Sequence, residues 1–236
     1  EFGTVFSKTP DLTLTKTDWR DRPVFWFRSW SMPGGVPNET IHLWQDRNGC
    51  NGQYPKGMNY FNYQDKEIGR PLSVGGGFMY GFLGKYKDTH PEFFPFVDGR
   101  RVLTNHAQPC FTNPEALKTL IKEAREQLKN APEDTIILDC GNEDTWRCCE
   151  CSECLKPIKL PDGTELAPKS PSGEKDPLFR STQMYMFLNR VAEDLVKDYP
   201  NLKIMTLAYI FAAEPPKVPV HPAVLVLFAP YPTVNM

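Results

Sequence analysis

The sequence lacks the features that would place the chain in a membrane or on nucleic acid. Its longest purely apolar runs, such as Val224–Ala229, are far too short to cross a bilayer. Its formal net charge is only −2 and its lysines and arginines are scattered, so it offers no basic surface for nucleic acid or an anionic membrane. No GxSxG or HExxH motif is present, which disfavours an esterase or a metallopeptidase. We therefore expect no nucleic-acid partner and no membrane insertion.

The beginning of the chain also carries little information. It shows no signal peptide, and we interpret residues 1–19 as an N-terminal extension or a vector-derived segment, which leaves a removed leader open. The 236 residues suffice for one large domain, and we assign residues 20–236 to it. The seven cysteines are an odd number, so at least one is free or a group of them binds something.

Apolar runs and helix signals alternate along this domain. Asn113 can cap a helix that Pro114 begins, and apolar residues then recur at helical spacing. A Pro-, Gly- and Ser-rich segment, 155–180, reads as a long surface loop or lid. We predict about six strands, at 24–30, 72–74, 108–111, 135–138, 202–210 and 223–228, and helices at 39–47, after 113, and at 182–197. This alternation predicts an α/β fold with parallel strands.

The most informative stretch runs from residue 134 to residue 154. A short buried strand is followed by Gly141, two adjacent acids, Glu143 and Asp144, and the aromatic Trp146. Four cysteines then fall within seven residues. In α/β folds, sites are built at the carboxyl ends of strands, where loops are free to carry polar groups. This stretch is therefore the leading candidate site.

Three interpretations of the cysteines remain open. Thiolates of Cys149, Cys151 and Cys154 could join Cys110, which ends the preceding predicted strand, in a tetrahedral structural zinc site. Alternatively, an extracellular loop is held by a disulfide, for example from Cys154 to a distant partner. In the third interpretation all of them are reduced thiols. A metal held by four thiolates has no open position for a substrate, so its role would be structural.

Several short motifs follow one another along the domain. They lie at 90–94 (HPEFF), 98–101 (DGRR), 110–115 (CFTNPE), 149–154 (CECSEC), 185–192 (YMFLNRVA), 199–200, 207–209 and 221–222. Together and in this order they resemble those of the DUF4838 family, uncharacterised bacterial proteins similar to barrel glycoside hydrolases of the hexosaminidase and α-glucuronidase type. The resemblance covers roughly residues 20–232. The resemblance implies a (β/α)8 TIM-barrel fold, action on an oligosaccharide or polysaccharide, and a secreted or periplasmic location. Six strands would make an incomplete barrel, so we expect a fragment of a longer chain with further domains, or closure by another route.

Two positions depart from the family pattern. The family usually has Asn-Asp before the cysteine motif, whereas this chain has Glu143-Asp144, so only Asp144 carries over as a matched acid. The family also tends to have Gly-His after the second strand, where this chain has Gly-Gly-Phe at 76–78.

The acids give the catalytic hypothesis. Barrel hexosaminidases are similar in placing adjacent acids at the end of the fourth strand, and in our count the strand at 135–138 is the fourth. We expect Glu143 or Asp144 to be the general acid of a glycoside hydrolase and the other to orient the substrate, with Asp139 a third candidate. Alternatively, the two acids only cap the next segment or pair with Arg147.

Other residues could bind sugar, because aromatic faces near strand ends can stack on pyranose rings and polar groups can bind hydroxyls. His106 lies in a polar loop and could also contact sugar hydroxyls. Each of these residues could instead serve only in packing or in a turn. The candidates are Trp30, Trp44, Arg47, Asn48, His90, Trp146 and Tyr209. The rival to a hydrolase is a non-catalytic glycan-binding or scaffold barrel.

Overall fold

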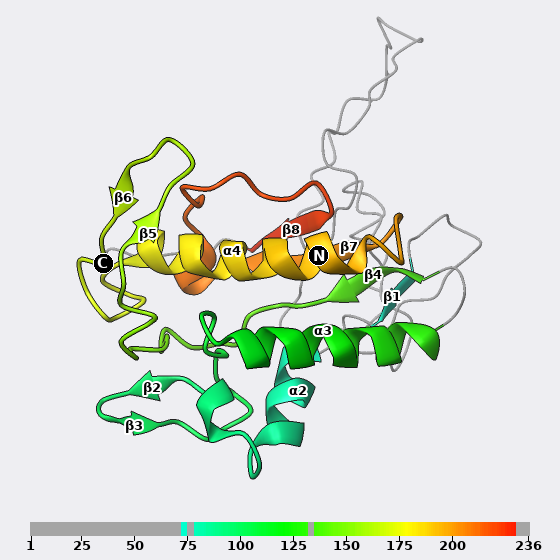
Figure 1. The fold of residues 1–236 in the computed structure, drawn as a ribbon, viewed down its shortest axis with the longest axis horizontal. Helices are drawn as coiled ribbons and strands as arrows, with labels where there is room; N and C mark the ends of the chain where they lie inside the picture. Colours follow the sequence, from blue (N-terminus) through cyan, green and yellow to red (C-terminus); the bar gives the residue numbers. More distant parts are fainter. Residues whose placement is uncertain (1–71, 75–77, 132–134, 230–236) are drawn as a thin grey trace, which may run out of the picture. The chain divides into compact units, whose positions relative to one another are not determined.

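The computed structural model describes residues 72–74, 78–131 and 135–229 (Figure 1). All of them belong to the second of two compact units in the chain, Tyr54–Met236. The elements predicted at 24–30 and 39–47, and the predicted domain start at residue 20, lie outside the described residues. No helix in the described part of the chain is long and apolar enough to cross a membrane.

Four parallel strands form the main sheet, and they are arranged in the order in which they occur along the chain. The order is β1-β4-β7-β8, with every neighbouring pair parallel. Within the described ranges the sheet is open, and no closed barrel is found. The predicted α/β class with parallel strands is therefore confirmed. The strands are β1 (Leu72–Val74), β4 (Thr135–Asp139), β7 (Lys203–Ala208) and β8 (Val224–Phe228).

The helix α3 (Pro114–Lys129) begins as its sequence predicts. The Oδ1 atom of Asn113 accepts hydrogen bonds from the backbone N–H groups of Glu115 and Ala116, at 2.9 and 3.0 Å. Pro114, which has no N–H group to satisfy, is the first helical residue. The alanines and leucines that recur on one face of this helix lie in the core.

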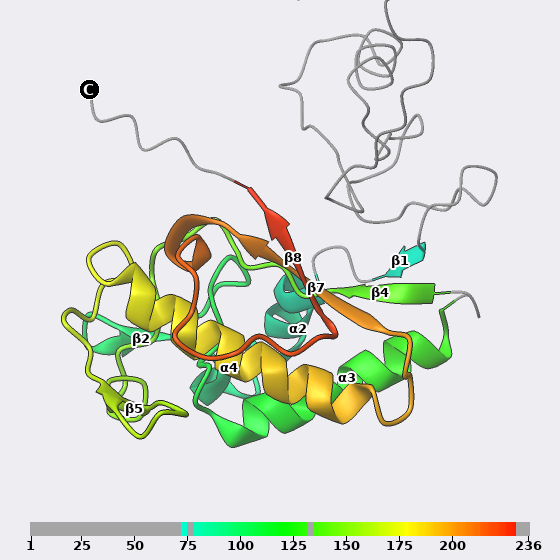
Figure 2. The same ribbon diagram turned by 90° about the horizontal axis from the view of Figure 1, so that it is seen from above.

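The helix α4 (Pro177–Leu195) contributes more buried residues than any other described element, and it contacts α3, β7 and β8. Figure 2 shows α3 and α4 next to each other. Arg125 of α3 pairs with Asp194 at 2.6 Å and with Asp198 at 2.9 Å. One hydrophobic cluster joins these helices to inward side chains of the strands, including Leu138, Ile204 and Val224.

Smaller elements lie between these helices and strands. Two antiparallel hairpins, β2–β3 and β5–β6, lie on the side toward which β4 points (Figure 1). The bounds are α2 (Phe78–Tyr86), η1 (Pro91–Phe93), β2 (Phe96–Val97), β3 (Arg100–Arg101), β5 (Ile158–Lys159), β6 (Glu165–Leu166) and η2 (Ile210–Ala212).

The strand predicted at 108–111 is wrong. β1 pairs directly with β4, with Leu72 opposite Thr135, which leaves no place between them. The segment packs beside η1 instead, where the N–H of Cys110 donates to the carbonyl oxygen of Phe93 at 2.8 Å. In the main sheet β4 therefore neighbours the strand at 72–74 directly, and it is not the fourth strand of our count.

Less of the segment 155–180 is irregular loop than its sequence predicts. It contains the β5–β6 hairpin, and α4 begins at Pro177 rather than at Thr182. Ahead of the helix, the buried Asp176 accepts a hydrogen bond through Oδ2 from the N–H of Lys169 at 2.6 Å. The same oxygen accepts from the N–H of Ser170 at 3.4 Å, so Asp176 ties the preceding loop to the start of the helix.

Candidate functional site

The central strand β4 ends at a buried carboxyl group. Asp139 is 2% exposed, and its Oδ1 accepts a hydrogen bond from the N–H of Gly141 at 2.8 Å. Burial disfavours the charged form and raises the pKa of Asp139 to about 7, although the Gly141 N–H opposes the shift. Asp139 thus holds the turn by which the chain leaves the strand.

Glu143 lies four residues further on and is only partly enclosed. Its side chain is 18% exposed, and its Oε2 lies 3.4 Å from Nδ1 of His106. Burial raises the pKa of Glu143, and the contact with His106 acts in the opposite direction. A half-buried carboxyl group with a raised pKa and an open side is typical of a proton donor.

The neighbouring acid, Asp144, differs from Glu143 in its exposure. The N–H of Thr145 donates to the carbonyl oxygen of Glu143 at 2.7 Å, so the backbone turns tightly at Asp144. Asp144 is exposed, whereas Glu143 is directed toward His106. No ion pair joins either acid to Arg147 among the described residues. The structure therefore does not bear out the alternative in which the acids pair with Arg147.

Gln108 holds the backbone around the two acids. This side chain is 1% exposed, and its Nε2 donates to the carbonyl oxygens of Glu143 at 2.8 Å and Thr145 at 3.4 Å. Its Oε1 accepts from the N–H of Glu143 at 3.4 Å. A single amide thus satisfies three backbone groups of the loop.

His106 and Tyr80 form the open side of this group. The His106 side chain is 71% exposed, and its ring meets that of Tyr80 edge to face, with centroids 4.7 Å apart. Tyr80 lies in α2, which follows the carboxyl end of β1. Sequence reasoning missed Tyr80 and Gln108, because they lie far from Glu143 along the chain and no motif connects them.

The carboxyl end of β7 lies against the same loop. The buried Asn142 donates through Nδ2 to the carbonyl oxygen of Tyr209 at 3.3 Å, and its Oδ1 has no hydrogen-bond partner among the described residues. The next residue, Ile210, has a positive φ of 51°, which is strained for a β-branched side chain. Strain of this kind clusters at functional sites.

The four predicted cysteines come together in one cluster. The sulfur atoms of Cys110, Cys149, Cys151 and Cys154 all lie within 4.8 Å of one another. Sγ of Cys110 lies 3.8 Å from Sγ of Cys151 and 3.6 Å from Sγ of Cys154. These distances exceed the roughly 2.05 Å of a disulfide bond, and the six cysteines in the described ranges are free. The set could hold a metal ion.

Hydrogen-bond donors surround the sulfur atoms. The N–H of Phe96 points at Sγ of Cys149 at 3.3 Å, and Nη1 of Arg101 lies 3.8 Å from the same atom. Thr112 contacts Sγ of Cys154 through Oγ1 at 3.0 Å. Donors directed at sulfur favour thiolates over thiols.

The cluster also rests on a buried arginine. Arg180 is 0% exposed, and its guanidinium donates to the carbonyl oxygens of Cys149 at 3.0 Å and Pro171 at 2.7 Å. Gln183 donates to the carbonyl oxygen of Cys154, also at 3.0 Å. No described carboxylate forms an ion pair with Arg180.

The pKa values separate the cluster from the other cysteines. Hydrogen bonds from Cys149 and Cys154 lower the pKa of Cys110 well below its usual range, so one thiolate forms readily. The hydrogen bond with Cys110, together with burial, raises the pKa of Cys149 to about 12. Cys140 and Cys148 lie outside the cluster, and burial is the main cause that raises the pKa of Cys148 to about 12. Cys140 and Cys148 are therefore structural thiols.

The remaining predicted sugar contacts are not gathered at these acids. His90 stacks on Phe93, with centroids 4.6 Å apart, and contacts Glu92 at 3.0 Å. Trp146 packs against the hydrophobic core. Tyr209 contacts the loop that carries the two acids through its carbonyl oxygen, which accepts a hydrogen bond from Asn142. The other four candidates, Trp30, Trp44, Arg47 and Asn48, lie outside the described residues.

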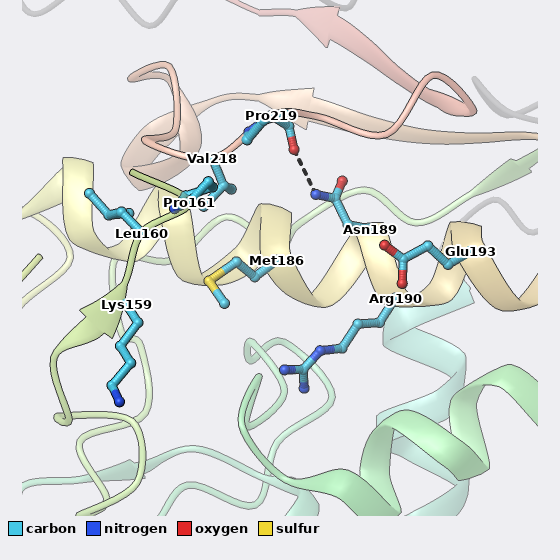
Figure 3. Close-up of a pocket in the computed structure, with 9 residues that line it drawn as sticks. All are labelled: Lys159, Leu160, Pro161, Met186, Asn189, Arg190, Glu193, Val218 and Pro219. Atoms are coloured by element: carbon cyan, nitrogen blue, oxygen red, sulfur yellow. Dashed lines mark hydrogen bonds between the residues drawn. The ribbon is translucent and has the colours of Figure 1, made fainter. Parts of the chain in front are cut away.

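An open groove of about 360 Å³ lies elsewhere, on the outer side of α4 (Figure 3). Lys159, Met186 and Arg190 line it, together with the chain at 218–219. None of the strand-end acids or clustered cysteines lines this groove. It is therefore separate from the candidate site.

Comparison with known proteins gives one match. A family model described as a domain of unknown function, DUF4838, matches residues 4–234. No curated protein and no solved structure matches the chain.

Proposed function

The chain belongs to the DUF4838 family, and from that premise we propose that it is a carbohydrate-active enzyme of the glycoside hydrolase type, with Glu143 as the proton donor. The family description names no activity, so the proposal depends on this chain's own residues. One observation carries it. Glu143 follows the carboxyl end of the central parallel strand, keeps an open side toward His106, and has a raised pKa.

Cleavage of a glycosidic bond needs a carboxylic acid that still holds its proton at the working pH. Partial burial keeps Glu143 protonated to a higher pH than an exposed glutamate, and its open side lets a leaving oxygen approach. The proton passes from the Glu143 carboxyl group to the leaving oxygen as the bond to the sugar carbon breaks. Gln108 keeps the backbone of this acid fixed during that transfer.

The other two acids take different roles in this proposal. The exposed Asp144 orients the substrate, because its carboxyl group is open to a sugar group. Asp139 lies too deep to meet a sugar and instead supports the turn at Gly141. This division follows from exposure, and it does not depend on counting β4 as the fourth strand.

We further propose that the sheet belongs to a (β/α)8 barrel. Two observations support this. The strands are neighbours in chain order with no reversal, unlike a doubly wound sheet, and α3 and α4 share one hydrophobic core with the strands. A secreted or periplasmic location remains a prediction.

For the cysteine cluster we propose a structural zinc ion. A tetrahedron with zinc–sulfur distances of about 2.3 Å has sulfur–sulfur edges of about 3.8 Å. The two sulfur–sulfur contacts of Cys110, 3.6 and 3.8 Å, fit such edges. Four sulfur ligands in tetrahedral geometry favour zinc over harder ions such as magnesium.

Charge balance also supports this centre. A divalent ion bound by four thiolates carries a formal charge of about −2. Two positive charges lie near this centre. One is on Arg101, which contacts Sγ of Cys149, and the other is on Arg180, which donates to the Cys149 carbonyl oxygen. Four neutral thiols would leave the fully buried Arg180 without a counter-charge, and an unpaired buried charge is costly. All four zinc positions are filled by protein, so the ion would stabilise the loop and would not bind substrate.

The experiment is a screen of the purified protein against chromogenic glycosides and polysaccharides, followed by Glu143→Gln. We expect Glu143→Gln to lower kcat by at least about a hundredfold, since a general acid contributes about 10² or more. Glu193→Gln is the matched control, because Glu193 is exposed on α4. A Glu143→Gln variant with full activity on a hydrolysed substrate would refute the role of this acid.

A glycan-binding protein without catalysis is the second candidate. The exposed pair of His106 and Tyr80 favours it, because an aromatic rim can hold a sugar ring without a proton donor. Binding of an oligosaccharide that weakens in Tyr80→Ala and is unchanged in Glu143→Gln, with no hydrolysis in the screen, would favour this candidate over the enzyme.

A further inference from the structure

Two segments that are distant in the sequence meet at two neighbouring places. One segment carries Gln108 and Cys110, and the other carries Glu143 and Cys149. At the first place Gln108 bonds to the backbone of Glu143. At the second, the sulfur of Cys110 lies in the cluster with those of Cys149, Cys151 and Cys154.

The two meeting places are close along both segments. Gln108 lies only two residues before Cys110, and the carbonyl oxygen of Thr145, the third group that Gln108 contacts, lies four residues before Cys149. A short connection holds its two ends in a defined relative position, because few backbone dihedrals separate them and the chain between them has little conformational freedom. Whatever joins the sulfur atoms therefore also sets where the Gln108 amide meets the Glu143 backbone.

A bound metal joins the sulfur atoms much more firmly than thiol contacts do. Thiols are weak hydrogen-bond donors and acceptors, whereas a tetrathiolate metal site links its ligands with near-fixed geometry. The second segment is also tied to α4, since Arg180 and Gln183 hold the carbonyl oxygens of Cys149 and Cys154. The first segment is held near Cys110 by the Phe93 carbonyl oxygen. The cluster thus adds a further link between two segments that already meet at Gln108.

We propose that Gln108 is a positioning residue that couples metal binding in the cysteine cluster to the placement of Glu143. This inference rests on the proposed zinc centre and on the proposed role of Glu143. Zinc fixes Cys110 relative to Cys149, Cys110 fixes Gln108, and the Gln108 amide holds the N–H and carbonyl groups of Glu143. Loss of the metal then makes the loop at 141–147 more mobile, although no metal takes part in the reaction.

The test is hydrogen–deuterium exchange of the whole protein, loaded with Zn²⁺ and then treated with a chelator, which requires no substrate. The amide of Glu143, which donates to Gln108, reports the coupling. We expect exchange in 141–147 to become about tenfold faster on zinc removal, while β7 is unchanged, since one lost hydrogen bond shifts local opening by about that factor. Gln108→Leu should give the same acceleration with zinc still bound. Lys156→Ala, an exposed change beside the cluster, is the control.

These measurements distinguish a failure of the coupling from a failure of the two proposals on which it rests. If chelation unfolds the whole chain, the test relies on the Gln108→Leu protein with zinc bound. Exchange in 141–147 that is no faster in this variant than in the zinc-loaded wild type would overturn the coupling. Equal exchange with and without zinc in the wild type would also overturn it. A protein that takes up no Zn²⁺ would overturn the metal centre and this inference together. A protein without glycosidase activity would still show the coupling, and that outcome would overturn only the proposed reaction.

Discussion

The guanidinium of Arg180 donates from Nη1 to the carbonyl oxygen of Cys149 over 3.0 Å, in a position with no exposed surface. This bond joins the helix α4 to the chain segment that carries the clustered cysteines. A charged donor gives a stronger hydrogen bond than a neutral one, and its removal leaves a buried acceptor without a partner. The consequences of this contact can be measured directly.

Arg180→Met should lower the free energy of unfolding by about 3 kcal/mol or more, because the buried carbonyl oxygens of Cys149 and Cys154 each lose a charged donor. Urea unfolding measures this change. Arg190→Met, an exposed change on the same helix, should stay within about 0.5 kcal/mol of the wild type. Equal stability of the two variants would contradict the structural role of Arg180.

Cys154→Ser should abolish stoichiometric zinc binding and lower the free energy of unfolding by about 3 kcal/mol or more, because a structural zinc ion contributes to folding directly. Cys148→Ser is the matched control, since Cys148 is buried nearby but lies outside the cluster. Elemental analysis should find one zinc per chain in the control. Zinc retained in full by Cys154→Ser would exclude the four-cysteine site.

Asp139 should make the protein less stable as the pH rises. Its folded pKa of about 7 exceeds the value of about 3.9 in an unfolded chain, so the folded state holds more protons between these values. The free energy of unfolding therefore falls from about pH 4 to pH 7, by up to about 4 kcal/mol from this group. Asp139→Asn removes that dependence while it keeps an acceptor for the Gly141 N–H.

The measurement is urea unfolding of wild type and Asp139→Asn between pH 4 and pH 8. The variant should gain stability relative to the wild type as the pH rises, and Asp88→Asn, an exposed change, is the control. A constant difference between wild type and Asp139→Asn across this range would contradict the raised pKa.

Asn113→Ala should cost about 1 kcal/mol of unfolding free energy, the usual price of an N-cap, because two N–H groups of α3 lose their acceptor. Thermal unfolding measures it. Lys118→Ala, on the exposed face of the same helix, is the control. A larger loss in the lysine variant would show that the cap is not the stabilising contact.

Local patterns were sufficient to predict α3 and β4. The capping asparagine, the following proline and the apolar spacing define the helix, and a short apolar run defines the strand. The prediction that four cysteines gather is confirmed, but the reason given for Cys110 was wrong, since it ends no strand. It reaches the cluster because its backbone bonds to Phe93.

The arrangement around Glu143 could not be predicted in the same way. His106 and Gln108 lie more than thirty residues from it in the sequence, and their contacts depend on how α3 and β4 place the intervening chain. Nor does the sequence distinguish the two adjacent acids. Only the tight turn at Asp144 leaves one enclosed and the other exposed.

The strand order β1-β4-β7-β8 bears on how the protein is made. Each strand pairs with the one synthesised before it, so the sheet can extend in the direction in which the ribosome delivers the chain. No strand has to wait for a later one to be inserted between two that have already paired. A nascent chain that ends after β7 should therefore already pair β1 with β4 and β4 with β7 as it leaves the exit tunnel.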